Sequence, residues 1–116
     1  GVAFAFKDSF NALAAAGTNV TRLMAVGGGS RSDLWLKIIA TVLGVPVHVP
    51  VKGDFGAAFG AARLAMIAAT GASWSSILKK PEFAKTFKPE AKAVDAYARR
   101  YETYKKLYPA LKEAMQ

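Results

Sequence analysis

Three consecutive glycines, Gly27, Gly28 and Gly29, directly follow an apolar run and precede a segment of helical spacing. This junction constrains the fold more than any other part of the sequence. Residues 21–26 (TRLMAV) predict a short buried strand. Residues 30–43 carry apolar side chains at intervals of three and four, which predicts an amphipathic helix. A strand, a glycine turn and a helix in succession indicate an α/β architecture.

The rest of the chain continues this alternation of helices and strands. Residues 45–51 place valine at every second position, which predicts a strand with one buried face. Because Pro46 and Pro50 cannot donate ladder hydrogen bonds, this strand is expected to be short or to lie at a sheet edge. Gly17 and Gly44 stand where helices are expected to end. Further helices are predicted over residues 1–16, 55–69, 73–80 and 90–116.

Three features near the C-terminal half depart from a simple amphipathic pattern. The helix predicted over residues 55–69 is apolar almost all round, so it is expected to be buried on more than one side. Residues 81–89 (PEFAKTFKP) are expected to be irregular, with their phenylalanines as anchors. Pro109 is expected to bend or restart the last helix, whose stripe of tyrosines should pack against the rest of the domain.

Composition excludes several classes of protein. The chain has 116 residues, of which 53% are hydrophobic and 21% charged, which fits one compact domain and argues against disorder. It has no cysteine, so disulfide frameworks and thiol catalysis are excluded, and a cytoplasmic protein is expected. The most apolar run, residues 57–69, contains Arg63 and is shorter than the roughly 20 residues of a membrane span. The first residues show no signal-peptide pattern, and because position 1 is not methionine, we expect a piece of a longer chain.

The glycine junction also indicates chemistry. Glycines let a ligand approach the backbone, and the unpaired N–H groups at the start of a helix favour an anion. The junction lacks the third glycine of a dinucleotide-binding G-x-G-x-x-G motif because position 32 is serine, and the chain contains no Gly-Lys-Ser/Thr of a P-loop. From the spacing alone, a phosphate or nucleotide site and a tight turn without a ligand both stay open.

The order of the motifs resembles that of one family. The stretch LMAVGGGSRSDLWLKIIATVLGVPVHVP, followed by GDFGAAFGAARLAMIAATG, resembles the C-terminal domain of FGGY-family carbohydrate kinases, most closely the xylulose-phosphorylating members. The resemblance covers residues 1–72, and the last helix (AYARRYETYKKLYPALKE) looks similar as well. It implies that residues 1–116 form the C-terminal part of the nucleotide-binding domain. The implied fold is a partial actin-like ATPase (ribonuclease H-like) domain, with a short sheet, helices and a long C-terminal helix. The N-terminal kinase domain, which supplies the catalytic aspartate of the family, is expected to be absent.

The resemblance implies a kinase that uses ATP and Mg²⁺ to convert D-xylulose to xylulose 5-phosphate. Gly27, Gly28 and Gly29 would line the nucleotide. Ser32 stands where relatives such as glycerol kinases have an asparagine that contacts the nucleotide. The chain is expected to hold no catalytic residue and no metal ligand, to be inactive alone, and to bind ATP or ADP weakly. A side chain at Gly28 is expected to obstruct the nucleotide and to strain the turn.

Other chemistry-bearing residues have simpler structural explanations. Asp54 precedes a helix and is expected to cap it. His48 is the lone histidine, without a second metal ligand near it in sequence. Arg63 is expected to reach the surface or to pair with an acid. The net charge of +8 lies mostly after residue 78 among interspersed acids, which favours a solvated helix face over nucleic-acid or membrane binding.

A second class of function stays open, namely a non-catalytic interaction domain whose basic C-terminal helix holds a partner or an identical chain. We also expect a symmetric homodimer. The strand at residues 21–26 would have an unpaired edge, and the apolar helix at residues 55–69 needs cover. An upstream sequence that encodes a matching kinase domain would favour the kinase over the interaction domain.

Overall fold

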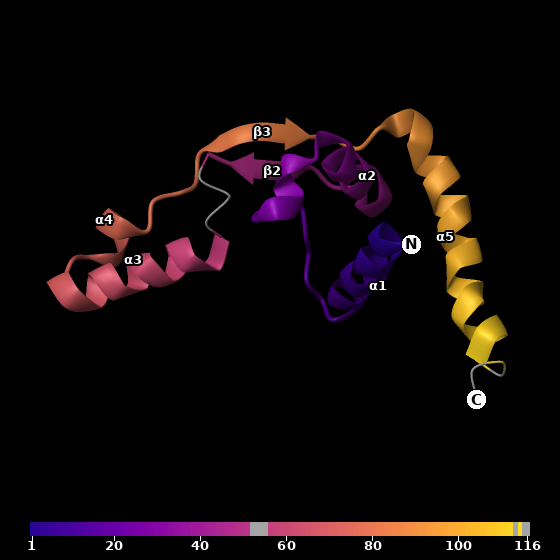
Figure 1. Ribbon diagram of the computed structural model, residues 1–116, viewed down its shortest axis with the longest axis horizontal. Helices are drawn as coiled ribbons and strands as arrows, with labels where there is room; N and C mark the ends of the chain where they lie inside the picture. Colours follow the sequence, from indigo (N-terminus) through magenta and orange to yellow (C-terminus); the bar gives the residue numbers. More distant parts are fainter. Residues whose placement is uncertain (52–55, 113, 115–116) are drawn as a thin grey trace.

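The computed structural model describes residues 1–51, 56–112 and 114. A small sheet lies at the centre, α5 descends at one end, and α3 and α4 project from the other (Figure 1). The predicted α/β class is confirmed. The elements are α1 (Val2–Ala15), β1 (Leu23–Met24), the 3₁₀ helix η1 (Gly28–Arg31), α2 (Asp33–Leu43), β2 (Val47–Pro50), α3 (Gly56–Thr70), α4 (Trp74–Ile77), β3 (Phe83–Phe87) and α5 (Ala91–Lys112).

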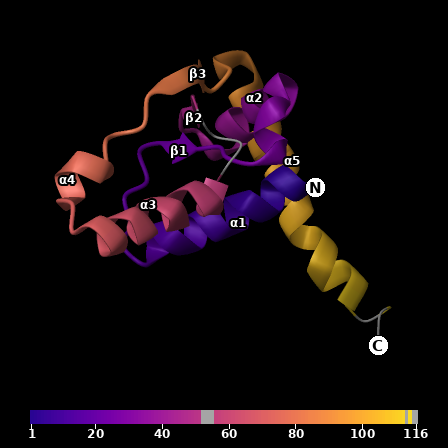
Figure 2. The same ribbon diagram turned by 60° about the vertical axis from the view of Figure 1, so that its left-hand side comes forward.

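The strands form one sheet in the order β1-β2-β3 (Figure 2). β1 pairs parallel with β2, with Leu23 opposite Val47, and β2 pairs antiparallel with β3. A register shift falls between Val49 and Pro50. Because proline cannot donate to the ladder, this irregularity lies where the pairing is weakest. The prediction that this strand is either short or at an edge is confirmed in its first alternative, since β2 has four residues and is central.

The segment predicted to be irregular, residues 81–89, contains β3. Its residues pair with β2 along most of their length, so the prediction is wrong. Phe87 is buried in the core, and Phe83 stacks on His48 with 4.4 Å between ring centroids. The flanking prolines favoured a loop. However, both lie outside the strand, and the run FAKTF shows no clean alternation of apolar and polar side chains, because Phe83, Lys85 and Phe87 share one face.

Most helix boundaries agree with the predictions, and their caps explain why. Gly17 and Gly44 follow α1 and α2 with φ of 88° and 77°, a left-handed conformation that glycine adopts without strain. The Ser73 hydroxyl accepts a hydrogen bond from the Ser76 amide at the start of α4 (3.3 Å), although α4 is shorter than predicted. Pro109 lies inside α5, which continues to Lys112.

The core gathers α1 and α2 against the sheet, with α5 alongside. Ala40 of α2 and Val47 of β2 are its most buried members, at 0% and 1% exposure. Burial of a side chain such as Leu36 contributes about 1.5–3 kcal/mol. The buried cluster comprises Ala3, Leu36, Ile39, Ala40, Val42, Leu43, Val47 and Phe87.

The tyrosine stripe of α5 packs on α1 along its first half. Tyr97, Tyr101 and Tyr104 surround Phe4, with ring centroids 6.4, 5.8 and 5.5 Å away. Further along the helix, Tyr108 is 68% exposed. The predicted packing role is therefore confirmed for the first three tyrosines and wrong for Tyr108, because α5 extends beyond the end of α1 (Figure 1).

Tyr101 also connects α5 to α1 through polar contacts. Its hydroxyl donates to the Asp8 carboxylate and accepts from the Asn11 amide, which lies 3.1 Å away. The hydrogen bond to Asp8 and burial of the ring raise the pKa of Tyr101 above its ordinary value of 10.0. This contact therefore favours the neutral phenol in the folded chain.

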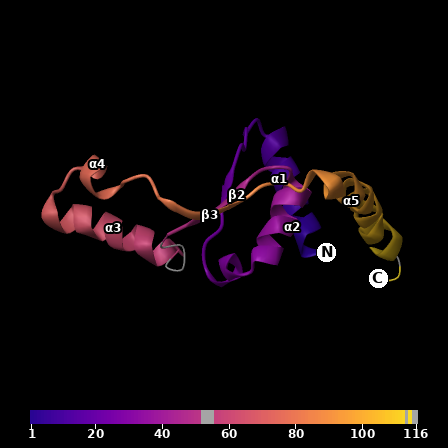
Figure 3. The same cartoon turned by 90° about the horizontal axis from the view of Figure 1, so that it is seen from above.

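The chain is less compact than its length predicts. Its radius of gyration is 18.0 Å, where about 13 Å is usual for this length. Its accessible surface is 8399 Å², where about 6,100 Å² is usual for this mass. Seen from above, α3 and α4 lie at the opposite end of the molecule from α5 (Figure 3).

Helix α3 accounts for part of this excess surface. None of its residues is buried, and Leu64 and Met66 are half-exposed. The prediction that α3 is buried on more than one side is wrong, because among the described elements α3 packs mainly on the short helix α4. Within the described ranges, no helix has both the length and the apolar character that a membrane span requires.

Candidate functional site

The glycine turn begins at the carboxyl end of β1. The Ala25 amide still donates to the His48 carbonyl of β2 (2.8 Å), and the chain then turns at Gly27. Gly27 has φ 76° and ψ −169°, a conformation that is essentially restricted to glycine. Gly28 and Gly29 lie outside the left-handed region. The prediction that a side chain at Gly28 would strain the backbone is therefore wrong, and a side chain at Gly27 would cause that strain instead.

The turn continues into η1, which joins it to α2. The Ser30 hydroxyl is buried and donates to the Gly27 carbonyl at 2.7 Å, so it stabilises the turn from inside. The Ser32 side chain caps α2 by accepting from the Trp35 amide at 3.3 Å. This use leaves the O–H of Ser32 as a donor on the exposed side. The cap of α2 is therefore Ser32, whereas Ser30 stabilises the turn.

The outer side of the turn is open. A Cβ added at Gly27 or Gly28 would meet no atom within 4 Å, and one at Gly29 would touch only the Trp35 indole nitrogen, at 4.0 Å. Gly28 and Gly29 begin the 3₁₀ helix, where no preceding turn supplies acceptors for the first N–H groups. A flat or anionic group can therefore approach this backbone closely.

Charged residues of three elements, η1, α2 and β3, lie beside the turn. Asp33, in the first turn of α2, forms an exposed ion pair with Lys85 of β3 at 2.8 Å. A cavity of about 200 Å³ next to the turn is lined by residues that include Ser30, Arg31 and Lys85. Since Lys85 lies in the segment predicted to be irregular, sequence reasoning missed it. The signal that could have indicated a strand there is the enrichment of aromatic and β-branched residues, Phe83, Thr86 and Phe87.

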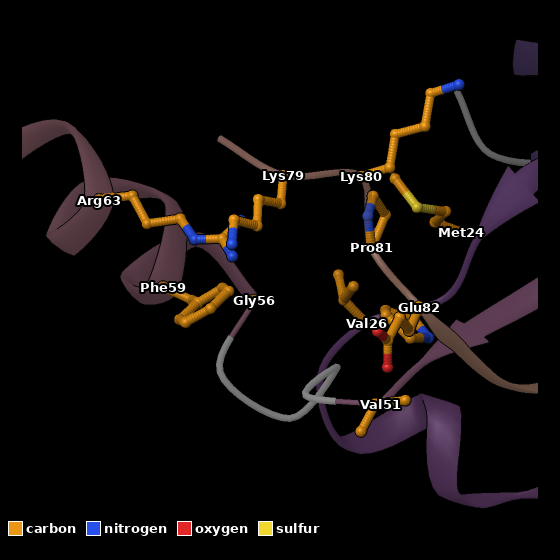
Figure 4. Close-up of a pocket in the computed structure, with 11 residues that line it drawn as sticks. Met24, Val26, Val51, Gly56, Phe59, Arg63, Lys79, Lys80, Pro81 and Glu82 are labelled. Carbon is orange, nitrogen blue, oxygen red and sulfur yellow. The ribbon is translucent and has the colours of Figure 1, made fainter. Parts of the chain in front are cut away.

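A larger cavity of about 400 Å³ lies between the sheet and α3. It is bordered by Met24 and Val26 of β1 and its continuation, and by Phe59 and Arg63 of α3 (Figure 4). The Arg63 guanidinium lies over the Phe59 ring, 4.2 Å from its centroid. Arg63 was expected to reach the surface or to pair with an acid; its side chain is half-buried, so it reaches the surface in part while it stacks on an aromatic ring.

The remaining chemistry-bearing residues have structural roles where they are described. The His48 ring lies 2.8 Å from the Thr86 hydroxyl and stacks on Phe83, which agrees with the structural explanation. Asp54, the expected helix cap, lies outside the described residues. Among the residues that the structure describes, no group of three or more His, Asp or Glu could hold a metal ion.

Comparison with known proteins extends this description. Residues 1–69 match the FGGY family of carbohydrate kinases, C-terminal domain. The chain is 35% identical to the xylulose kinase of Escherichia coli K12 over 112 residues, which is 96% of this chain and 23% of the relative. It is 30% identical to the xylulose kinase of Bacillus subtilis 168 over 97% of this chain and 23% of the relative. The chain thus spans about a quarter of these relatives.

Solved structures give the same result for the fold. The crystal structure of a "xyloylose kinase" from Brucella ovis superposes with a TM-score of 0.86 at 56% identity, over 100% of this chain and 24% of that chain. The xylulose kinase from Rhodospirillum rubrum superposes with a TM-score of 0.77 at 30% identity, over 97% of this chain and 23% of that chain. The fold is accordingly part of the actin-like ATPase fold of these sugar kinases.

Proposed function

The chain belongs to the FGGY family of carbohydrate kinases, and we propose that it forms the C-terminal part of the nucleotide-binding domain of a kinase that phosphorylates D-xylulose with ATP. The observation that carries the proposal is the open glycine turn at the carboxyl end of β1. In open α/β sheets, ligands bind outside the carboxyl ends of parallel strands, and β1 and β2 are parallel.

We assign the nucleotide contact to Gly27, Gly28, Gly29 and Ser32. The absence of side chains leaves the outer surface of the turn flat, so an adenosine group can lie against the backbone. The exposed Ser32 O–H can donate to a ribose or phosphate oxygen while its oxygen still caps α2. Among the described residues beside the turn, Arg31 and Lys85 outnumber the one carboxylate, Asp33, which pairs with Lys85, so the local charge favours an anionic ligand on balance.

We assign no residue of this chain to Mg²⁺ or to catalysis. The described residues hold no cluster of metal-ligating side chains, and the resemblance places the catalytic aspartate in the N-terminal kinase domain. Mg²⁺, when bound with ATP, would offset phosphate charge during the transfer. We therefore propose that these 116 residues alone are inactive, and that the complete kinase acts in the cytoplasm, where ATP is available.

The test uses a chimera in which this chain replaces the matching quarter of the Brucella ovis kinase. Gly28→Val should raise the KM for ATP at least about tenfold, which corresponds to roughly 1.4 kcal/mol of lost binding, and should leave the KM for xylulose nearly unchanged. Gly28→Ala is the graded comparison: its methyl group fits the folded chain and takes up less of the space assigned to the nucleotide, so it should raise the KM for ATP less than Gly28→Val does. Equal effects of Gly28→Val on both constants would show that the turn does not contact the nucleotide.

For the isolated chain we also propose a weak symmetric dimer. Its basis is the accessible surface of 8399 Å², which exceeds the usual value for this mass by about 2,300 Å². Sedimentation equilibrium over a range of concentrations tests it, and a single monomeric species up to high micromolar would refute it.

The alternative function, a non-catalytic interaction domain acting through the basic C-terminal helix, is favoured by the exposure of Tyr108 and Leu111 at the end of α5. ATP-dependent kinase activity of the chimera would decide against it.

A further inference from the structure

The ion pair between Lys85 and Asp33 lies beside the glycine turn. The Lys85 ammonium donates to both carboxylate oxygens of Asp33, at 2.8 and 3.1 Å. Asp33 is the first residue of α2, directly after the turn and η1. The ion pair therefore holds the Lys85 ammonium against the first turn of α2, although the two residues are 52 positions apart in sequence.

The topology brings Lys85 to the same end of the sheet as the turn. Because β1 and β2 are parallel, their carboxyl ends lie at one end of the sheet. Because β3 is antiparallel to β2, its first residues lie at that end, and Lys85 is opposite Val49, one residue before the end of β2. Ligands of open α/β sheets bind outside the carboxyl ends of the parallel strands. Lys85 thus approaches the proposed nucleotide site from a third strand.

The cavity of about 200 Å³ beside the turn connects η1 to Lys85. It is lined by Ser30 and Arg31 of η1, by the end of β2, and by Ala84 and Lys85 of β3. Lys85 therefore shares an open space with the turn, and a ligand on the outer surface of the turn can extend toward the ammonium.

The ion pair is easily exchanged for another anion. The side chains of Lys85 and Asp33 are 56% and 53% exposed, and an exposed ion pair contributes only about 0–1 kcal/mol. An ammonium group has three N–H donors, and two of those of Lys85 reach Asp33. A triphosphate carries several negative charges where a carboxylate carries one, so it competes successfully for the ammonium.

We propose that Lys85 is a nucleotide-binding residue that exchanges the Asp33 carboxylate for a phosphate oxygen of ATP. The inference rests on the proposed nucleotide site. Lysine binds phosphate as a point charge, and the negative charge of ATP lies on its phosphates and not on its adenosine. Lys85 therefore strengthens the binding of ATP but not of adenosine. Asp33 weakens the binding of ATP, because its carboxylate competes for the ammonium and repels the phosphates.

The test is calorimetric titration of the chimera described above with ATP and, separately, with adenosine. Lys85→Gln should raise the Kd for ATP about tenfold and change the Kd for adenosine by less than about twofold, whereas Lys85→Arg should keep most of the affinity for ATP. Lys106→Gln is the matched control, since it removes an exposed charge from the half of α5 that extends away from the sheet (Figure 1), and it should change neither constant. An unchanged Kd for ATP in Lys85→Gln, an equal loss for ATP and adenosine, or an equal effect of Lys106→Gln would overturn the proposal.

Asp33→Asn tests the exchange of partners. It should lower the Kd for ATP about two- to fivefold and leave that for adenosine unchanged, because it frees the ammonium and removes a repulsive charge. A raised Kd for ATP in Asp33→Asn would overturn the exchange. Gly28→Val in the same titrations separates this inference from the proposed function. If Gly28→Val weakens ATP binding and Lys85→Gln does not, the nucleotide site stands and the role of Lys85 is wrong; if neither does, both are wrong.

Discussion

Replacement of Gly27 by alanine tests whether backbone conformation alone makes glycine necessary in the turn. Gly27 has φ 76° and ψ −169°, and an added Cβ would meet nothing within 4 Å, so strain is the only folded-state penalty. Such a conformation costs about 1–3 kcal/mol for a residue with a Cβ. Alanine also lowers the conformational entropy of the unfolded chain, which stabilises the folded state by about 0.4–1 kcal/mol. Gly27→Ala should therefore reduce the free energy of unfolding by about 1–2 kcal/mol.

Gly28→Ala is the control for this prediction. Gly28 has equal space but lies outside the left-handed region, so its substitution should change the free energy of unfolding by less than about 0.5 kcal/mol or increase it slightly. Urea denaturation followed by tryptophan fluorescence measures both variants. Trp35 lies beside Gly29, whereas Trp74 is 62% exposed and should change little. Equal destabilisation by the two substitutions would show that φ is not what requires glycine at position 27.

Three further predictions follow from other contacts. Tyr101→Phe should cost about 1–2 kcal/mol at neutral pH, because it removes the hydrogen bonds to Asp8 and Asn11. Since the folded pKa of Tyr101 is raised, that contribution is complete below pH 10 and is lost as the pH rises through the raised pKa, so unfolding curves of the two proteins should converge in alkali. Lys85→Ala should cost less than about 1 kcal/mol, because its ion pair with Asp33 is exposed, and a larger loss in urea denaturation would contradict this. The isolated chain should show no phosphoryl transfer to xylulose and should bind ATP with a Kd of about 1 mM or weaker by calorimetry. Enzyme-like turnover would refute this last prediction.

Local chemistry explains where the sequence predicted well. The positions of Gly17 and Gly44, the serine cap at Ser73 and the helical period of α2 all act within a few residues. The junction of strand, glycine turn and helix was likewise visible, because only glycine tolerates the conformation at Gly27. The order of motifs also identified the family that the comparisons confirm.

Long-range pairing explains where the predictions failed. β3 forms because β2 offers a second edge, and this pairing also makes β2 central. Lys85 reaches Asp33 only through that pairing, across 52 positions of sequence. Neither the flanking prolines nor the valine alternation reports which strands become neighbours.

The sequence by itself therefore determined the helices, the first two strands, the glycine turn and the family, since these depend on residue conformation and on the order of motifs. Only the tertiary structure decided which strand lies in the centre, which edge stays open and how much of α3 is exposed. An apolar pattern indicates that a helix is buried against other residues, but it does not tell whether those residues belong to the same 116-residue chain. That depends on the area available for burial in three dimensions.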